Sequence, residues 1–596
     1  TGLSLQASSI PPVNLAGPVK IQADLNYQGQ GKAELHFENF FPQTLRHWLD
    51  LPVLISQGYM EQGTLYVAYE RGEISQFDWH SQWRNFILHE QQGEQALDVQ
   101  LDALDLQVSS LNGLSLPYQI KLSASNLNVQ ATEFFRHPIA LFGVQAEGQY
   151  LETSEQLARI ELSQLRVRLP SGSIQGHGSW QVDPYSDNGL LDLQAKIDFL
   201  DLADLPHYLP KAIAADSLNW LEKAFQGGRI ENAQLAIKGV VDHIPYGRRP
   251  NSGEFHIQGE VRDVVLNYHQ RPDRGGKYWP KLIAPHAQID FLADNIQVTA
   301  QQAQLEGAES VALSDLHAHI AHIEKDTEVS IKAQVAASGQ EFLNFYQISP
   351  LQRILRGALN QSQITGQLQG QIALQIPITH VDDTTVNGQL NVNQASFQFE
   401  PIYPVLTQAK GTLLVSEKNL QVKELHGKML GGPVSVQGVI GGAGDSLSLS
   451  GELSGQGLRE FLPLKGLQRV EGRTAYTAQL DFLGQERMNF SMSSSLKGLA
   501  LKLPGALNKT AAQTQPLRVQ WLDKRPQGTR QLLVDYANQQ VRAVFERVDK
   551  RSSFFHRGVI AINRSAQLPS KGLAVLIQGG DWDLVQWQDL IDEFGE

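Results

Sequence analysis

Apolar and polar residues alternate one by one along most of this chain. In LDLQAKIDF, residues 191–199, every second side chain is apolar and those between are polar. The same alternation occurs in four other clear segments: 19–27, 329–335, 389–399 and 447–453. Because side chains alternate across a β-strand, each segment has one apolar and one polar face. The pattern predicts a mostly β protein whose antiparallel sheet is covered on one side only.

Turn signals separate these segments at short intervals. Asn-Gly occurs at 112–113, 188–189 and 387–388, and Gly-Gly at 431–432 and 441–442. A spacing of roughly 18–20 residues per strand predicts about 30 strands, which is more than one β-sandwich holds. Laid edge to edge at about 4.8 Å each, they would form a sheet on the order of 140 Å long. Such a sheet must curl, split or coil.

One segment, 217–239, starts with a helical pattern in place of alternation. Its apolar residues share one face at helical spacing: Leu218, Leu221 and Phe225. Asp216 or Ser217 is placed to cap the N-terminus of the helix, and Gly227-Gly228 to close its C-terminus. We expect a helix that connects two sets of strands, with a lid over the apolar face as the alternative role.

Weaker copies of this helix-then-strand pattern occur at 45–67, 351–374 and 458–480. The sequence DWDLVQWQDLIDEF, residues 581–594, predicts a further amphipathic helix that packs on the core or caps the sheet. We expect repeating β-groove units with short connecting helices, joined into one elongated unit. The expected segments are 1–203, 204–346, 347–457 and 458–596.

Composition narrows the possible partners. The net charge of −13 argues against a nucleic-acid partner and against electrostatic docking on anionic lipid. The chain has no cysteine, which removes disulfides, thiolate metal sites and cysteine nucleophiles. No run approaches the roughly 18 apolar residues of a membrane span. Because the chain begins TGLSLQ, we interpret it as a fragment or processed piece.

The sequence offers little to support catalysis. G-x-S-x-G, the P-loop pattern and H-E-x-x-H are all absent, so we predict no catalytic residue and no cofactor. HAHIAH, residues 317–322, carries three histidines, but the alternation places His317 and His319 on the polar face, and we predict no metal. The loop RPDRGGKYWPK, residues 271–281, mixes basic and aromatic residues as a lipid headgroup or partner contact would. An ordinary solvated loop is the preferred interpretation.

Two architectures satisfy the one-sided alternation. The apolar face packs on a second sheet in a string of sandwiches, or it lines an open hydrophobic groove that needs an apolar occupant such as acyl chains. Alternation alone does not separate them. If a groove forms, we expect the apolar face of the clearest strands to line it: Leu191, Leu193, Ile197, Phe199, Leu235, Ile237, Ile331, Val335, Val392, Phe397 and Phe399.

Residues 208–246 resemble the signature region of the YhdP group of AsmA-like envelope proteins of Gram-negative bacteria. The matching marks are Leu-Pro at 209–210, NWL at 219–221, GGRI at 227–230 and IPY at 244–246. The resemblance implies a β-taco fold, akin to TamB and to eukaryotic bridge-like lipid-transfer proteins. It also implies a periplasmic protein anchored in the inner membrane through an N-terminal helix that this chain lacks.

The resemblance implies non-enzymatic movement of phospholipid between the inner and outer membranes. Its partners would be phospholipid acyl chains, the two membranes, and envelope proteins at either end. Two alternatives remain at this stage. One is a structural or adhesive β-sandwich surface protein with a dry core. The other is a groove chaperone for outer-membrane proteins, and an enzyme is the least favoured function.

Overall fold

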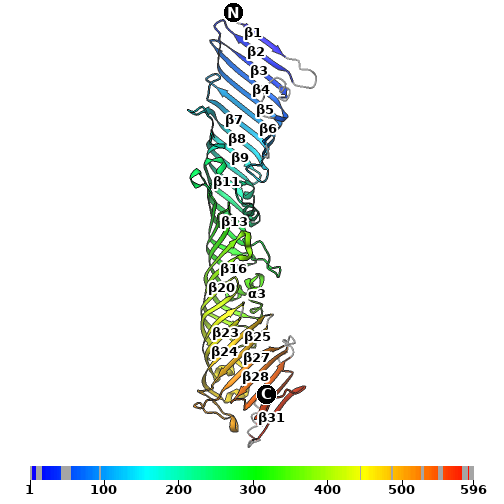
Figure 1. Cartoon of the computed structure of the whole chain (residues 1–596), viewed down its shortest axis with the longest axis vertical. Coiled ribbons are helices and arrows are strands. Elements are labelled where there is room, and N and C mark those ends of the chain that lie inside the picture. Colours follow the sequence, from blue (N-terminus) through cyan, green and yellow to red (C-terminus); the bar gives the residue numbers. More distant parts are fainter. Residues whose placement is uncertain are drawn as a thin grey trace.

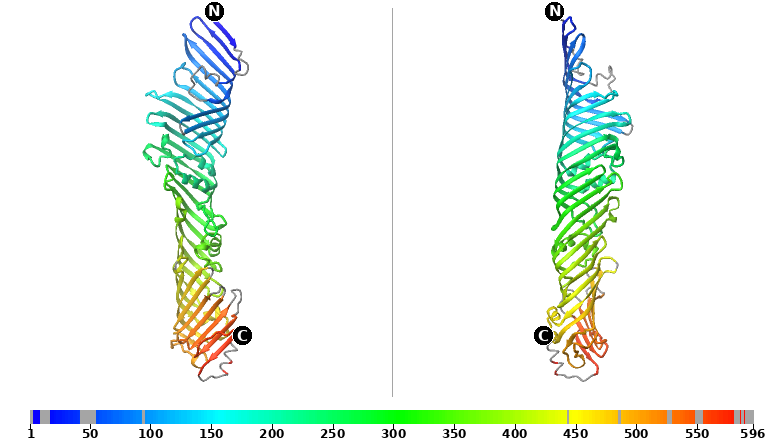
Figure 2. Two further views of the ribbon diagram at one scale, coloured as in Figure 1. Left: turned by 45° about the vertical axis from the view of Figure 1, so that its right-hand side comes forward. Right: turned by 90° about the vertical axis from the view of Figure 1, so that its left-hand side faces the viewer.

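The computed structural model contains one sheet of 31 strands that runs the length of an elongated molecule (Figure 1). It describes residues 3–8, 17–41, 55–92, 95–442, 444–484, 487–524, 529–547, 555–579, 585 and 588. The two termini lie near opposite ends of the long axis, and the outline stays narrow in two rotated views (Figure 2). The predicted long, curled sheet with short helices is confirmed.

The first half of the sheet contains strands β1 to β17: β1 Leu3–Ser8, β2 Val19–Leu25, β3 Gly31–Phe40, β4 Ile55–Glu70, β5 Glu73–Gln92, β6 Gln95–Ser110, β7 Tyr118–Ala131, β8 Ile139–Glu152, β9 Ala158–Leu169, β10 Gly172–Asp183, β11 Ser186–Asp201, β12 Phe225–Val240, β13 Gly253–Leu266, β14 Leu282–Leu292, β15 Asn295–Leu305, β16 Ala308–Ala321 and β17 Glu328–Ser338.

The second half contains β18 to β31: β18 Gln363–Pro377, β19 Thr385–Gln398, β20 Leu406–Ser416, β21 Leu420–Met429, β22 Gly432–Ile440, β23 Ser446–Ser454, β24 Val470–Gly484, β25 Arg487–Ser494, β26 Leu499–Leu501, β27 Leu517–Lys524, β28 Thr529–Tyr536, β29 Val541–Arg547, β30 Arg557–Ile562 and β31 Gly572–Ile577. The α-helices are α1 Ala215–Ala224, α2 Gly339–Ile348, α3 Leu351–Ile354 and α4 Gly455–Phe461. The 3₁₀ helices are η2 Leu202–Tyr208, η3 Val241–His243, η4 Pro250–Ser252, η5 Ile378–Asp383, η6 Lys465–Arg469 and η7 Gly505–Leu507.

Each strand pairs with its neighbours in sequence, so the sheet is a meander. From β1 to β25 every pairing of successive strands is antiparallel, β27 continues from β25, and β26 pairs with β24. The last pair, β30 and β31, is parallel. The sheet is continuous across the expected segment boundaries, because β11 pairs with β12, β17 with β18 and β23 with β24.

Successive antiparallel strands place their connections alternately on two long sides of the sheet. We call one side the helix rim. It carries the connections after β11, β13, β17, β19 and β23, which include helices α1 to α4. We call the other side the turn rim, which carries the connections after β12, β16, β18, β20 and β22. Register shifts interrupt many of the pairings, and such β-bulges increase local bend and twist.

The two rims meet in the middle of the molecule and form a seam. Ser217 Oγ, after β11, lies 2.5 Å from Thr327 Oγ1, after β16. Arg356, after β17, forms a 3.6 Å ion pair with Asp445, after β22. In both cases the partner lies five strands further along the sheet. The strip is therefore rolled obliquely, with the stagger that twisted strands impose on any rolled sheet.

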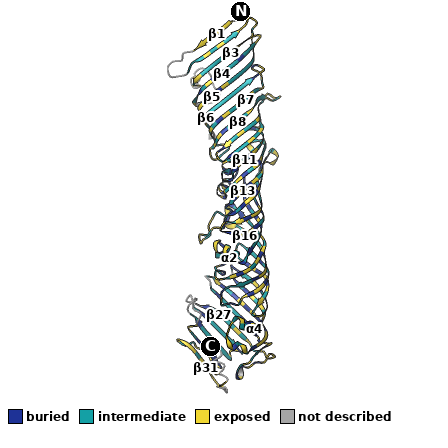
Figure 3. Cartoon of the chain, turned by 180° about the vertical axis from the view of Figure 1, so that it is seen from behind, coloured by how far each residue is buried: buried dark blue, intermediate teal, exposed yellow. Residues whose placement is uncertain are grey.

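Burial divides the molecule into two regions. We call β1–β8 the trough and β12–β28 the tube. In the described part of the trough four apolar side chains are buried: Met60, Val67, Leu101 and Ala124. The tube is buried along nearly every strand, as the dark blue of its interior shows beside the teal and yellow of the trough (Figure 3). The same alternating pattern thus gives a half-exposed apolar face in one region and an enclosed one in the other.

The helix predicted after residue 216 forms, but its ends differ from the prediction. Its N-cap is Ala214, which makes no side-chain cap hydrogen bond, and Ser217 instead contacts Thr327. Gly227 and Gly228 lie inside β12, where two register shifts flank Gly227. Gly228 has φ of +121°, so this pair forms a bulge and not a helix cap.

Other local predictions had mixed outcomes. Helices lie at the start of the copy at 351–374 and within that at 458–480. Asn188-Gly189 and Asn387-Gly388 lie within strands β11 and β19, whereas the two Gly-Gly pairs lie in or beside turns. The helix expected at 581–594 and the first part of the copy at 45–67 fall outside the described residues, apart from 585 and 588.

Candidate functional site

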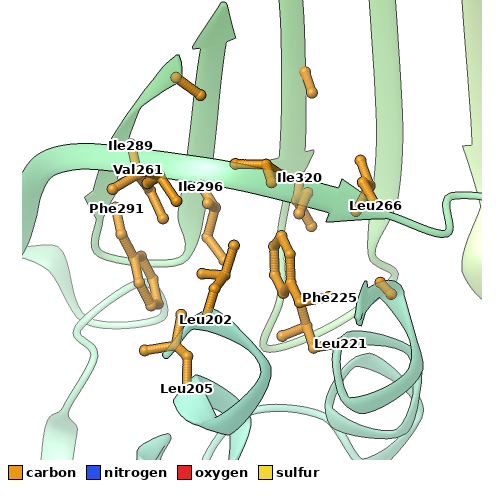
Figure 4. Packing of buried hydrophobic residues seen from close by; sticks show 14 of the residues in the cluster. Leu202, Leu205, Leu221, Phe225, Val261, Leu266, Ile289, Phe291, Ile296 and Ile320 are labelled. Atoms are coloured by element: carbon orange, nitrogen blue, oxygen red, sulfur yellow. The ribbon is translucent and has the colours of Figure 1, made fainter. Parts of the chain in front are cut away.

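The connection between β11 and β12 fills the interior of the rolled sheet. Its apolar side chains are 1–4% exposed at Leu202, Leu205, Leu218 and Leu221. They pack against Val261, Ile289, Phe291, Ile296 and Ile320, which point inward from strands β13 to β16 (Figure 4). We call residues 202–224 the plug. At this level the plug packs against the apolar face of the sheet and covers it.

Polar contacts hold the plug to both rims. Besides the Ser217–Thr327 contact, Ala214 N donates to Ile323 O at 3.1 Å across the seam. On the helix rim, Gln270 Nε2 donates to Trp220 O at 2.8 Å. The helix therefore acts both as a connection between adjacent strands and as a cover on the apolar face. The two roles considered from the sequence occur together.

Below the plug the tube contains two apolar cavities, each partly open to solvent. The first has about 1200 Å³ of empty space, and its lining includes Tyr268, Trp279, Ile331 and Val335. The second has about 920 Å³, and its lining includes Phe397, Phe399, Tyr403 and Phe490. Phe342 of α2 and Leu368 of β18 line both, so the cavities adjoin. Concave spaces lined by apolar and aromatic side chains are typical of small-molecule sites.

The apolar face of the trough carries two tryptophans on strand β5. Trp79 and Trp83 of β5 project to the apolar face, opposite Val108 and Leu104 of β6. Both indole Nε1 atoms donate to Ser81 Oγ at 3.0 Å, and Ser81 is 1% exposed. Because their N–H groups are satisfied within the sheet, the rings present only apolar surface to the trough.

A buried ion cluster closes the seam below the second cavity. The Arg530 guanidinium donates to both carboxylate oxygens of Glu400, at 2.7 and 3.2 Å, and its Nε lies 3.4 Å from Asp523. All three side chains are at most 7% exposed. Burial alone would lower the pKa of Arg530, but hydrogen bonds and the charge of Glu400 outweigh it and raise the pKa. The cluster joins the two rims through one guanidinium that lies between two carboxylates.

Burial shifts other groups that line the interior. It raises the pKa of Tyr476 to about 12, and it raises the pKa of Tyr268 and Tyr403 further. Burial also raises the pKa of Asp445 although Arg356 opposes this. The phenol groups of these tyrosines therefore stay neutral around pH 7.

The structure distributes the sequence-predicted groove residues along the interior. Ile331 and Val335 line the first cavity, and Phe397 and Phe399 line the second. Val392 is buried in the core of the tube. Ile197, Leu235 and Ile237 belong to the packed cluster around the plug. Leu191 and Leu193 are half-buried on β11, beside Gly239 and Ile237 of β12.

Phe199 is the exception, because it lies on the outer face. The β10–β11 register shifts between Ile197 and Phe199, so Asp198 and Phe199 both face outward and Leu200 takes the inward position. Phe199 is 38% exposed, and the Arg229 guanidinium lies 5.3 Å from its ring centroid. A bulge that reverses the alternation leaves no signal in the period-two pattern.

Sequence reasoning missed the residues that cover the tube. Phe342 and Phe345 of α2 face the first cavity, and Trp279 of the preceding helix-rim loop contacts Phe345 at 6.3 Å between ring centroids. The spacing of apolar residues in EFLNFYQI, 341–348, would have indicated an amphipathic helix. Of the histidine segment, His317 and His319 lie on the outer face of β16, as the alternation predicted.

Comparison with known families now adds to this geometry. The sequence profile described as YhdP protein matches residues 6–596, nearly the whole chain. The chain belongs to the YhdP family. The resemblance in residues 208–246 is thereby confirmed, and in this member of the family that segment forms most of the plug and β12.

Among curated proteins, the chain is similar to the intermembrane phospholipid transporter YhdP of Escherichia coli strain K12. The two are 23% identical over 394 residues, which is 65% of this chain and 30% of that protein. No solved structure matches the chain. Among the described residues, no helix has both the length and the apolar character needed to cross a membrane.

Proposed function

We propose that this chain moves phospholipid, without catalysis, by carrying acyl chains along its apolar interior. The observation that carries the proposal is the pair of adjoining apolar cavities inside the tube. The chain would form a stretch of a periplasmic conduit between the inner and outer membranes, anchored in the inner membrane by a preceding segment. The name of the Escherichia coli relative supports this proposal.

The physical need for such a conduit follows from the cost of exposing acyl chains. Two sixteen-carbon chains hold about 30 methylenes, and exposing each to water costs about 0.8 kcal/mol, about 24 kcal/mol in all. A barrier of that height gives a rate near 10⁻⁵ per second, on the order of one event per day. An apolar interior keeps the chains out of water, so the remaining barrier is friction between neighbouring sites. No reacting side chain is required.

The structure favours this function over the two alternatives. A dry β-sandwich requires two packed sheets, whereas here one sheet rolls upon itself around empty apolar space. A chaperone groove for polypeptide requires backbone partners for an unpaired strand. The cavity linings are instead almost entirely apolar side chains, which suit acyl chains.

Photocrosslinking in purified protein tests the proposal. Probes at Val335 and Phe397 point into the cavities, and probes at Lys332 and Asn391 on the same strands are exposed controls. After incubation with phospholipid vesicles, we expect lipid adducts at Val335 and Phe397 and none at Lys332 and Asn391. Equal labelling of all four, or none, would reject the conduit.

An inward charge tests transport itself. Val335→Asp places a carboxylate in the first cavity, and we expect it to reduce lipid transfer between vesicles while the protein still folds, because Val335 is only partly buried. Ile197→Asp is a poorer test, since Ile197 is 3% exposed in the packed cluster and the charge would disrupt folding.

A further inference from the structure

The plug raises the question of how a lipid reaches the first cavity. Directly above the cavity, plug residues occupy the interior between trough and tube. Below it, the seam is closed where Arg356 pairs with Asp445. At Gly441 of the turn rim a Cβ would lie only 2.9 Å from Ile354 O of the helix rim. Between these two closures lies a short window of seam.

The first cavity reaches the seam in this window. Its lining includes Trp279, Leu351 and Ile354 from the helix rim, and Ser416 and Glu417 from the turn rim. Residues of both rims therefore border the same apolar space. A lipid whose chains enter here would leave its headgroup at the seam, in water.

The loop between β13 and β14, residues 267–281, forms one lip of this window and is built rigidly. Asp273 Oδ1 accepts from the backbone N–H groups of Gly275 and Lys277 at 2.9 Å each, which fixes the tip. Its other oxygen accepts from Arg353 Nε of α3 at 2.8 Å. Lys277 Nζ donates to Gln352 Oε1 at 2.7 Å. The loop stands out from the body beside α3 (Figure 1).

Two arginines of this loop are available to bind a ligand. Arg271 and Arg274 are exposed, and the structure shows no ion pair for either among the described residues. Many other lysine and arginine side chains of this acidic chain form exposed ion pairs. Guanidinium groups bind phosphate oxygens through paired hydrogen bonds, and here they stand on a loop whose Trp279 enters the apolar cavity.

We propose that loop 267–281 is a lateral port, where Arg271 and Arg274 bind the phosphate of a phospholipid whose chains enter the first cavity beside Trp279. This inference rests on the proposed function and adds an entry site to it. The plug covers the apolar face above the first cavity. The loop carries groups for both parts of a phospholipid within a few residues, arginines for the phosphate and Trp279 for the chains. Lipid would thus be exchanged at the seam and not only along the axis.

Photocrosslinking at the port tests this. p-Benzoylphenylalanine replaces Tyr278, which is 55% exposed beside Trp279, and the purified chain meets vesicles of radiolabelled phosphatidylethanolamine and phosphatidylglycerol in equal amounts. We expect Arg271→Glu with Arg274→Glu to lower the lipid adduct about tenfold, because charged hydrogen bonds are lost. Arg473→Glu with Arg518→Glu makes the same charge change at exposed positions of β24 and β27, and should leave the adduct unchanged.

The control variant, calorimetry with phosphate and a second probe distinguish the possible outcomes. An unchanged adduct in the Arg271 and Arg274 variant, or an equal loss in the control, would overturn the port. Calorimetry with inorganic phosphate alone should show no binding; binding that needs both arginines would make this a free-anion site and overturn the lipid assignment. A second probe at Phe397 separates the two proposals. If Phe397 is labelled and Tyr278 responds to neither variant, the port fails and the conduit stands, whereas no label at either position overturns both.

Discussion

The trough and the tube are built from the same alternating strands, yet only the tube encloses its apolar face. Strand β7 of the trough alternates as regularly as β17 of the tube, but its inward residues Ile120 and Leu122 stay half-exposed while Val329 and Ile331 are buried. The difference lies in the connections. In the tube, helix-rim segments reach the turn rim and supply apolar cover. The alternation of residues determines which face of the sheet is apolar, and the connections between strands determine whether that face is enclosed.

Removing the buried cation at the seam should have the largest effect. Arg530→Met leaves Glu400 and Asp523 buried without their partner, which costs about 3–5 kcal/mol. In the trough, Lys20→Met removes the cation of an exposed pair with Glu38 and should cost less than about 1 kcal/mol. Urea unfolding of both variants measures the contrast. Equal costs would contradict the distinction between a sealed and an open region.

Shortening a buried side chain of the plug should have the second-largest effect on stability. Leu221 is 1% exposed in the packed interior, so Leu221→Ala should cost about 2–5 kcal/mol. Leu122→Ala, on the half-exposed face of β7, removes less buried surface and should cost about 1 kcal/mol. Native-state hydrogen exchange of the surrounding strands reports each local stability. A plug variant as mild as the trough variant would show that the helix only rests on the sheet.

The glycine pair after the plug gives a finer test. Gly228 has φ of +121°, where a β-branched residue is strained, so Gly228→Val should destabilise by about 1–3 kcal/mol. At Gly227 the nearest neighbour of a Cβ would be the Val265 side chain at 3.3 Å, and Gly227→Val should cost less. Thermal unfolding of the two variants tests this order. The reverse order would rule out strain at the bulge as the cause.

The smallest effect should follow a change on the outer face of β11, beside the tube. Phe199→Ala loses an exposed contact with Arg229, worth about 0.5–1 kcal/mol. Lipid labelling inside the cavities should not change in this variant. A large loss of stability or of labelling would return Phe199 to the interior, as its place in the alternation first indicated.

Much of the fold could be read from the sequence because period two is a direct record of a one-sided strand. The one-sided antiparallel sheet and the inward face of Ile331 or Phe397 follow from it, and the spacing of the turns predicts the strand number. Phe199 could not, since one bulge reverses the face without altering the residues around it.

The closure of the tube was also beyond the sequence. It depends on contacts between residues more than a hundred positions apart, such as Ser217 with Thr327 and Glu400 with Arg530. Each of these residues alone resembles an ordinary polar residue near a turn. The basic loop 271–281 illustrates the same limit, because its residues were visible in the sequence but its place at a cavity mouth was not.

The five-strand offset between the rims at Ser217–Thr327 and Arg356–Asp445 has a consequence for how such a molecule changes length. In a meander, one added hairpin lengthens the sheet by two strand spacings, about 10 Å, and disturbs few pairings. In the rolled region, however, a hairpin added between β11 and β16 would move Thr327 two places away from Ser217, and one added between β17 and β22 would move Asp445 away from Arg356. Insertions and deletions of hairpins should therefore accumulate in the trough, whereas the number of strands in the tube should stay constant.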